Sequence, residues 1–160
     1  MDIEIRNPWH PDDAKHYTTD RMRNDFLIQD LFIPDKVKLV YSHVDRIIVG
    51  GVCPSEKVLT LEAGHELGVD YFLERRELGV INIGGPGTVI LDGEEYDLSY
   101  KDGLYAGMGI KEVSFKSDDP ANPAKFYLNS APAHHTYPTL KITMEMANKR
   151  PLGSVEGCNK

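Results

Sequence analysis

Short apolar segments separated by polar turns dominate the chain between residues 37 and 129. Each segment is rich in β-branched and aromatic side chains and is bounded by Gly, Pro, Asp or Asn, which is typical of β-strands. No long helical segments alternate with them, so the pattern predicts an all-β fold, either a sandwich or a barrel. The predicted strands cover residues 37–42, 46–52, 58–61, 70–73, 79–83, 88–91, 94–98, 113–116 and 125–129.

Residues 88–98 predict the clearest local structure, a tight hairpin. Asp92-Gly93 separates two of the apolar segments. An Asp-Gly pair favours the type I′ turn, because both central residues of that turn need a positive φ. The twist of the turn also matches that of the flanking strands. We therefore expect 88–91 and 94–98 to pair directly.

The N-terminal region predicts an arm that carries a short helix. Residues 1–18 are polar, and Thr19-Asp20 is a favourable start for a helix over residues 21–26. Pro34-Asp35 then interrupts the apolar residues that follow the helix. We therefore expect residues 1–34 to lie outside the barrel, which is assigned to residues 35–130.

The C-terminal region, residues 131–160, predicts a linker. Pro132 and Pro138 favour extended chain around His134-His135. Adjacent side chains in extended chain point to opposite faces, so one metal ion would rarely take both histidines. Residues 144–148 are long enough for one helical turn. Because no terminating element follows, we expect this region to lead toward a second domain.

Composition and charge narrow the class of protein. The 160-residue chain is 41% hydrophobic and 27% charged, which suits one globular domain. No apolar run approaches the roughly 20 residues of a membrane span, and the first residues lack an apolar signal segment. The net charge of −7, with no run of Lys or Arg, disfavours nucleic acid. Two cysteines without metal-type spacing suit a reducing compartment. We therefore expect a cytoplasmic protein without membrane partners.

The most unusual segment is YFLERRELGVINIGG, residues 71–85, in which the charges Glu74-Arg75-Arg76-Glu77 precede an apolar strand. Such charges are rarely buried unless they are paired. Three interpretations remain open: an Arg fork for a substrate carboxylate, an ion-pair network at an interface, or a solvated strand end. Strand alternation places Arg75 and Glu77 on one face. We expect that face to point inward, with Arg75 as the partner of Glu77 in a structural network.

Two further residues complete the candidate site. His43, in the segment YSHVDR, lies between two predicted strands beside Asp45 and Arg46. A histidine at this position could act as a proton shuttle near neutral pH, or it could be a hydrogen-bonded structural residue. No residue is assigned as catalytic. The candidate substrate-binding or structural charge network is therefore His43, Arg46, Arg75 and Glu77.

The charged segment also resembles the first motif of the cupins, which are β-barrel proteins in which two histidines and a glutamate of this motif bind a metal. Asp70 and Phe72 stand where the histidines would be, and a weaker second match has Glu112 in place of a histidine. Asp70, Glu77 and Glu112 offer oxygens to a hard cation, but without histidine we expect no metal in this barrel. The spacing fits the motif at Gly64, Asp70, Phe72, Glu77 and Gly84. This resemblance is the reason for expecting Glu77 to point inward.

Longer blocks carry a more specific resemblance, over about residues 19–154. They are YSHVDRIIVGG (41–51), YFLERRELGVINIGG (71–85), AKFYLNSAPAHHTYPT (124–139) and LGS (152–154). These blocks are similar to the 5-keto-4-deoxyuronate isomerases of bacterial pectin breakdown. The resemblance implies a degenerate cupin (RmlC-like) barrel or jelly roll. It also implies a ketol-isomerase that interconverts 5-dehydro-4-deoxy-D-glucuronate and 3-deoxy-D-glycero-2,5-hexodiulosonate, with a keto-uronate as its small-molecule substrate.

Members of that family are two-cupin proteins of nearly twice this length, and their zinc ligands (a His-x-His pair, a glutamate and a further histidine) lie in the second cupin. The resemblance therefore implies that this chain is the N-terminal half and holds no zinc ligand. It implies zinc in the full-length subunit, an inactive isolated half and a homo-hexamer. Two alternatives stay open: a non-catalytic scaffold or sugar-acid-binding module, and isomerisation by this barrel through Glu77 and Glu112.

Overall fold

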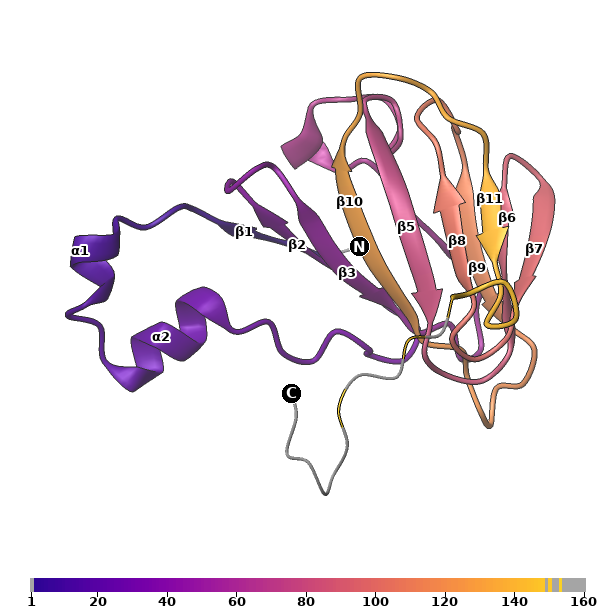
Figure 1. The fold of residues 1–160 in the computed structure, drawn as a ribbon, viewed down its shortest axis with the longest axis horizontal. Helices are drawn as coiled ribbons and strands as arrows, with labels where there is room; N and C mark the ends of the chain where they lie inside the picture. Colours follow the sequence, from indigo (N-terminus) through magenta and orange to yellow (C-terminus); the bar gives the residue numbers. More distant parts are fainter. Residues whose placement is uncertain (1, 149, 151–152, 154–160) are drawn as a thin grey trace.

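Two facing β-sheets make up most of the computed structural model, which describes residues 2–148, 150 and 153 (Figure 1). The larger sheet has seven strands in the order β1 (Asp2–Arg6), β2 (Val37–Ser42), β3 (Ile48–Val52), β10 (Phe126–Pro132), β5 (Arg76–Asn82), β8 (Gly103–Ala106) and β11 (Leu140–Ile142). The smaller sheet has four strands in the order β4 (Leu59–Thr60), β9 (Val113–Ser117), β6 (Gly87–Leu91) and β7 (Glu94–Leu98). The predicted all-β class is confirmed.

Strand pairing gives the fold the form of a jelly roll. β6 pairs with β7, β5 with β8, β4 with β9 and β3 with β10, and all four pairs are antiparallel. Strands β3 to β6 therefore pair in nested order with strands β10 to β7, as in one long hairpin that is rolled into two sheets. Two sheets built in this way are a jelly roll.

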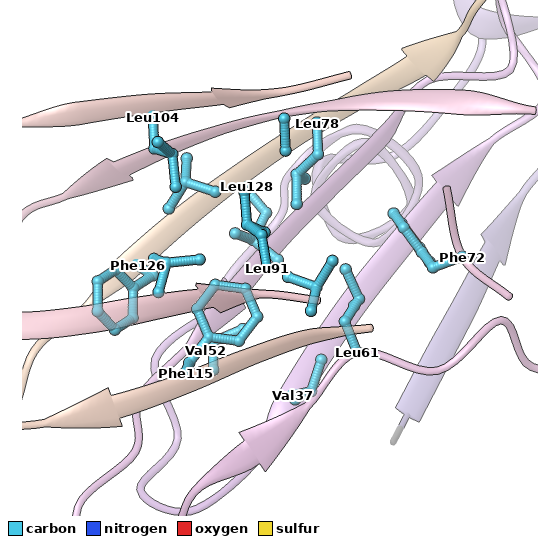
Figure 2. Close-up of a cluster of buried hydrophobic side chains, with 14 of the residues drawn as sticks. Val37, Val52, Leu61, Phe72, Leu78, Leu91, Leu104, Phe115, Phe126 and Leu128 are labelled. Carbon is cyan, nitrogen blue, oxygen red and sulfur yellow. The ribbon is translucent and has the colours of Figure 1, made fainter. Parts of the chain in front are cut away.

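Large apolar side chains fill the space between the sheets (Figure 2). Phe115 of β9 and Phe126 of β10 lie with their ring centroids 5.3 Å apart, and both are fully buried. Phe72, which precedes β5, is also buried in this cluster. Aromatic side chains contribute large buried areas to a core. The interior is thus a packed core, and polar chemistry must be sought at its margins.

The first residues of the N-terminal arm form β1 of the larger sheet, and the part that carries the helices extends away from the sheets (Figure 1). It contains the short helix α1 (Pro11–Ala14) and the helix α2 (Thr19–Phe26), which has no buried residue. Thr18 is the N-cap of α2, since its hydroxyl accepts a hydrogen bond from the Arg21 amide at 3.3 Å. The predicted helix is confirmed, and it begins slightly earlier than expected. No helix in the described residues is long and apolar enough to cross a membrane.

The chain after α2 returns along β3 at very close range. A Cβ atom added to Gly51 would lie 2.4 Å from the carbonyl oxygen of Leu31. Only glycine allows this approach of two backbone segments. Gly51 is therefore required at this position of β3, because any larger residue would collide with the backbone of the arm.

Several predicted strand boundaries are wrong. Residues 70–73 form bends and turns, and β5 begins only at Arg76. The sequence pattern missed β1, β8 and β11, because each is short and is held by a partner distant in sequence. β11 and the end of β10 lie within residues 131–160, so part of the range expected to be a linker belongs to the larger sheet. Most of residues 149–160 lie outside the described residues.

Two tight turns have the backbone of a type I′ hairpin. Asp92 and Gly93 have φ of 49° and 88°, and β6 pairs directly with β7, so the predicted Asp-Gly hairpin is confirmed. Between β2 and β3, Asp45 and Arg46 have φ of 52° and 54°. Two adjacent positive φ values are needed for this turn, and they are costly for an arginine.

Replacement of Arg46 by glycine is therefore expected to raise the free energy of unfolding by about 0.5–1 kcal/mol, because glycine adopts positive φ without strain. Chemical denaturation of the two proteins would measure the change. Arg46→Ala is the matched control, since alanine also removes the guanidinium but keeps a Cβ atom. An equal gain in the alanine variant would show that the stabilisation does not come from the backbone.

Candidate functional site

Strand β5 sets the orientation of the charged segment. Its inward face carries Arg76, Leu78, Val80 and Asn82, and its outward face carries Glu77, Gly79 and Ile81. The expectation that Glu77 points inward with Arg75 as its partner is therefore wrong. Leu78 and Val80 enter the core, and a strand that buries them must also bury the residues in the same phase. The sequence signal was present in this alternation, and it identifies Arg76 as the buried charge.

Arg76 joins three parts of the larger sheet through its hydrogen bonds. Its Nε donates to the Ser130 hydroxyl at 3.1 Å, and its Nη2 donates to the Ser130 carbonyl at 2.9 Å and to the Arg46 carbonyl at 2.5 Å. The Ser130 hydroxyl in turn donates to the Glu77 carbonyl at 2.6 Å. The guanidinium lies 5.6 Å from the ring centroid of Tyr41, within the range of a cation–π interaction. β5, β10 and the β2–β3 turn thus meet at one side chain.

A cavity of about 180 Å³ opens beside Arg76. We call it the arginine cavity, because three arginines line it together with Tyr41 and three apolar residues. Arg46 reaches it from the β2–β3 turn, and Arg75 reaches it from the residue before β5. Two of the predicted site residues, Arg46 and Arg75, are therefore brought together. The lining residues are Tyr41, Arg46, Leu67, Val69, Arg75, Arg76 and Pro132.

The electrostatic environment of the arginine cavity is positive. Burial lowers the pKa of Arg76 from its ordinary value, the charge of Arg46 lowers it further, and Tyr41 acts in the opposite direction. Arg75 is well exposed and lies 3.6 Å from Glu74, measured from Nε to Oε1. Because exposed ion pairs are weak, Glu74 offsets only part of the charge at the cavity.

The other two predicted site residues lie elsewhere. His43 is exposed, its ring packs edge-on against Tyr41 at 5.2 Å, and its backbone amide donates to the Arg6 carbonyl. Glu77 lies on the opposite face of the sheet from Arg76, where its carboxylate accepts a hydrogen bond from the Tyr105 hydroxyl at 2.8 Å. Burial of Tyr105 and this hydrogen bond raise the pKa of Tyr105 to about 12. His43 and Glu77 thus have no shared site.

Tyr105 also borders an apolar groove of about 320 Å³ on the outer face of the larger sheet. Gly79 and Gly103 form part of its floor, and Ile81, Tyr127, Ile142 and Met144 stand around them. The groove offers few polar groups to orient a small ligand, so it is a weaker candidate for specific ligand binding than the arginine cavity.

The described residues do not fit a zinc site. Asp70 and Glu112 are exposed at the surface, and Glu77 faces Tyr105 outside the core. Within residues 2–148, 150 and 153, no three His, Cys, Asp or Glu side chains come together in a way that could hold a metal ion. His134 and His135 are exposed, and His135 packs against Tyr137. The set of ligands that zinc requires is not offered by this part of the chain.

Comparison with known proteins places the chain among named relatives. The model of the KduI/IolB family matches residues 27–157. A 4-deoxy-L-threo-5-hexosulose-uronate ketol-isomerase of Lachnospira eligens is 60% identical, over 99% of this chain and 58% of that protein. Proteins of the same name from Lachnoclostridium phytofermentans and Yersinia pestis are 57% and 51% identical, over 57% and 58% of their lengths. The chain thus spans less than two thirds of the curated relatives it matches.

Solved structures give weaker likenesses. A cupin protein from Bacteroides fragilis matches with a TM-score of 0.42 and 16% identity, over 66% of this chain and 79% of that one. An RmlC-like cupin protein from Desulfovibrio desulfuricans matches with a TM-score of 0.41 and 14% identity, over 61% of this chain and 81% of that one.

The Tyr105–Glu77 hydrogen bond predicts a late-titrating tyrosine. Because the folded pKa of about 12 exceeds the unfolded value of 10.0, the pair stabilises the fold fully below pH 10 and loses this effect as the pH rises toward 12. The difference in phenolate absorbance between the parent chain and Tyr105→Phe should therefore have its midpoint near pH 12. Tyr100→Phe, which removes an exposed phenol, controls for the loss of one chromophore. A midpoint near pH 10 for Tyr105 would contradict the pairing.

Proposed function

Because the chain belongs to the KduI/IolB family, we propose that it is the N-terminal jelly roll of a 4-deoxy-L-threo-5-hexosulose-uronate ketol-isomerase. The observation that carries this proposal is the 60% identity to the Lachnospira eligens protein of that name over 99% of this chain. The matched region includes the core, the arm and the charged segment, because it covers 99% of this chain. The proposed substrate is accordingly a small keto-uronate, 5-dehydro-4-deoxy-D-glucuronate, and the product is 3-deoxy-D-glycero-2,5-hexodiulosonate.

A ketol isomerisation moves hydrogen between two neighbouring carbons. A base removes a proton from the hydroxyl-bearing carbon while the carbonyl oxygen gains a proton, which gives an enediol. The former hydroxyl then loses its proton and becomes the new carbonyl as a proton is added to the former carbonyl carbon. Zinc bound by the full-length subunit would polarise the carbonyl oxygen. The described residues do not fit that metal, so its ligands are proposed to lie beyond them. We propose that this chain forms the first domain of the enzyme and that its arginines offer positive charge to anionic ligands.

The broader setting follows from the same family. We propose a role in pectin and uronate degradation, a cytoplasmic location and a homo-hexamer. The acidic net charge of −7 is consistent with a protein that handles a small metabolite rather than nucleic acid.

A second candidate function is favoured by the arginine cavity. Three arginines that line one small cavity suit a domain that binds sugar acids without converting them. The two candidates differ in one measurable respect, because only the isomerase needs the region that its relatives have beyond the matched residues.

Reconstitution with that region would test the isomerase. The 160-residue chain alone is expected to show no turnover of the keto-uronate. Mixed with, or fused to, the C-terminal region of the Lachnospira eligens relative, it is expected to show zinc-dependent turnover that a chelator removes. The N-terminal region of the same relative, joined to the same C-terminal region, is the matched positive control.

Two outcomes would overturn parts of the proposal. An inactive hybrid beside an active control would argue against the isomerase. Turnover by the 160-residue chain alone, without zinc, would show that this jelly roll carries the chemistry itself and would return Glu77 and Glu112 to consideration.

A further inference from the structure

We propose that the arginine cavity binds the carboxylate of a small sugar acid, with Arg76 as the residue that anchors it. The anion site is argued from the geometry of this chain, and only the choice of a sugar acid as the ligand rests on the proposed function.

The first observation is a buried charge without a counter-charge. Arg76 is only 6% exposed. Among the described residues, no carboxylate forms an ion pair with it, whereas Arg6, Arg21 and Arg75 each have one. Removing a charge from water is costly unless an opposite charge or a full set of hydrogen bonds compensates. The site therefore favours the arrival of an anion.

The second observation is an open donor on the same guanidinium. The hydrogen bonds of Arg76 to described residues use Nε and Nη2, and none uses Nη1. Every fully shielded side-chain nitrogen or oxygen in the described residues has a partner, so Nη1 must retain access to solvent. Arg76 lines the arginine cavity, so on this proposal Nη1 opens into that cavity. A donor held rigid by its neighbours binds an acceptor at a low cost in side-chain entropy.

The other two arginines extend the positive charge around the opening. Arg46 is exposed on the β2–β3 turn, and Arg75 is 76% exposed at the side chain. With Arg76 they place three positively charged residues at one cavity on a chain whose net charge is −7. A cluster of charges of one sign attracts ions of the opposite sign to that place on the surface.

The size and walls of the cavity indicate what part of the ligand enters. At about 180 Å³, it is smaller than the roughly 300–1,000 Å³ of a typical pocket for a drug-sized ligand. It therefore fits a carboxylate and its neighbouring carbons, while the rest of a sugar acid stays outside. Leu67, Val69 and Pro132 supply apolar surface for the C–H groups next to the carboxylate.

A purely structural role leaves part of this arrangement unexplained. The bonds to Ser130 and to the Arg46 carbonyl account for Nε and Nη2. They do not account for the open Nη1 or for the convergence of two more arginines on the same cavity. A structural link alone would also give no reason for the cavity to stay open beside it.

NMR titration of the 160-residue chain with D-galacturonate tests the proposal, with D-galactose as the neutral sugar of matching size. The Nε–H signal of Arg76, which is held by the Ser130 hydroxyl, is the direct reporter. We expect saturable shifts of this signal with galacturonate and at least tenfold weaker binding of galactose. Equal shifts with the two sugars, or no saturation with galacturonate up to 50 mM (roughly the weak end of specific affinity), would overturn the proposal.

Matched variants locate the site. Arg75→Gln removes one positive charge at the cavity, and Arg23→Gln removes one from the exposed surface of α2. We expect severalfold weaker galacturonate binding in the first and unchanged binding in the second. Arg46→Gly should also weaken galacturonate binding severalfold. Because this substitution removes the backbone strain at the β2–β3 turn, the loss of affinity cannot come from unfolding. Arg76→Lys should weaken binding at least tenfold. Equal affinity in Arg75→Gln and Arg23→Gln would overturn the assignment.

Competition separates a carboxylate site from a general anion site. Inorganic phosphate and sulfate are expected to displace galacturonate only at higher concentration, and displacement at equal or lower concentration would overturn the carboxylate preference. The result is independent of turnover. Galacturonate binding with an inactive hybrid enzyme would keep this inference and remove the isomerase, whereas an active hybrid without galacturonate binding would do the reverse.

Discussion

Strand β5 buries a polar side chain at each end of its inward face, and the need to satisfy these two groups governs the structure around them. Arg76 stands at the first residue and Asn82 at the last, with Leu78 and Val80 between them in the core. The Asn82 amide donates to the carbonyls of Gly85 and Leu98 at 2.7 and 2.9 Å. Its oxygen accepts from the amides of Gly84 and Lys125 at 3.0 and 3.2 Å. A fully buried amide with all its groups paired specifies one arrangement of the backbone.

Asn82 and Arg76 differ in the hydrogen-bonding capacity and the charge that remain after their contacts within the fold. Asn82 ties the larger sheet to Leu98 of the smaller sheet, and its hydrogen-bonding capacity is used within the fold. Arg76 ties β5 to β10 and to the β2–β3 turn, but it retains one donor and an uncompensated charge. Buried polar groups can therefore serve architecture at one end of a strand and remain available for a ligand at the other. The interior between them is filled by apolar side chains, so ligand chemistry is confined to the margin of the jelly roll.

The sequence predicted those features that depend on local pattern. The all-β class and the Asp92-Gly93 hairpin follow from alternation and turn chemistry, and both are present. The orientation that the cupin spacing implies for Glu77 is wrong, because Leu78 and Val80 enter the core and strand alternation then places Glu77 on the opposite face. β8 and β11 were missed because their pairing depends on distant partners. The arginine cavity was only half predictable: Arg46 and Arg75 were expected near a charge network, whereas the roles of Arg76, Tyr41 and Ser130 depend on the tertiary contacts of β2 and β10.

The nested pairing of the strands also implies an order of assembly. β6 and β7 are joined by the Asp92-Gly93 turn and meet across a very short loop, while β3 and β10 are the most distant in sequence of the four nested pairs. Loop-closure entropy makes distant pairings slow, so the inner pair is expected to form early and the outer pair late. Ser130 lies on β10, and the Arg46 turn leads into β3. The arginine cavity is thus built by the last strands to come together, and only a molecule that has completed its folding can present it.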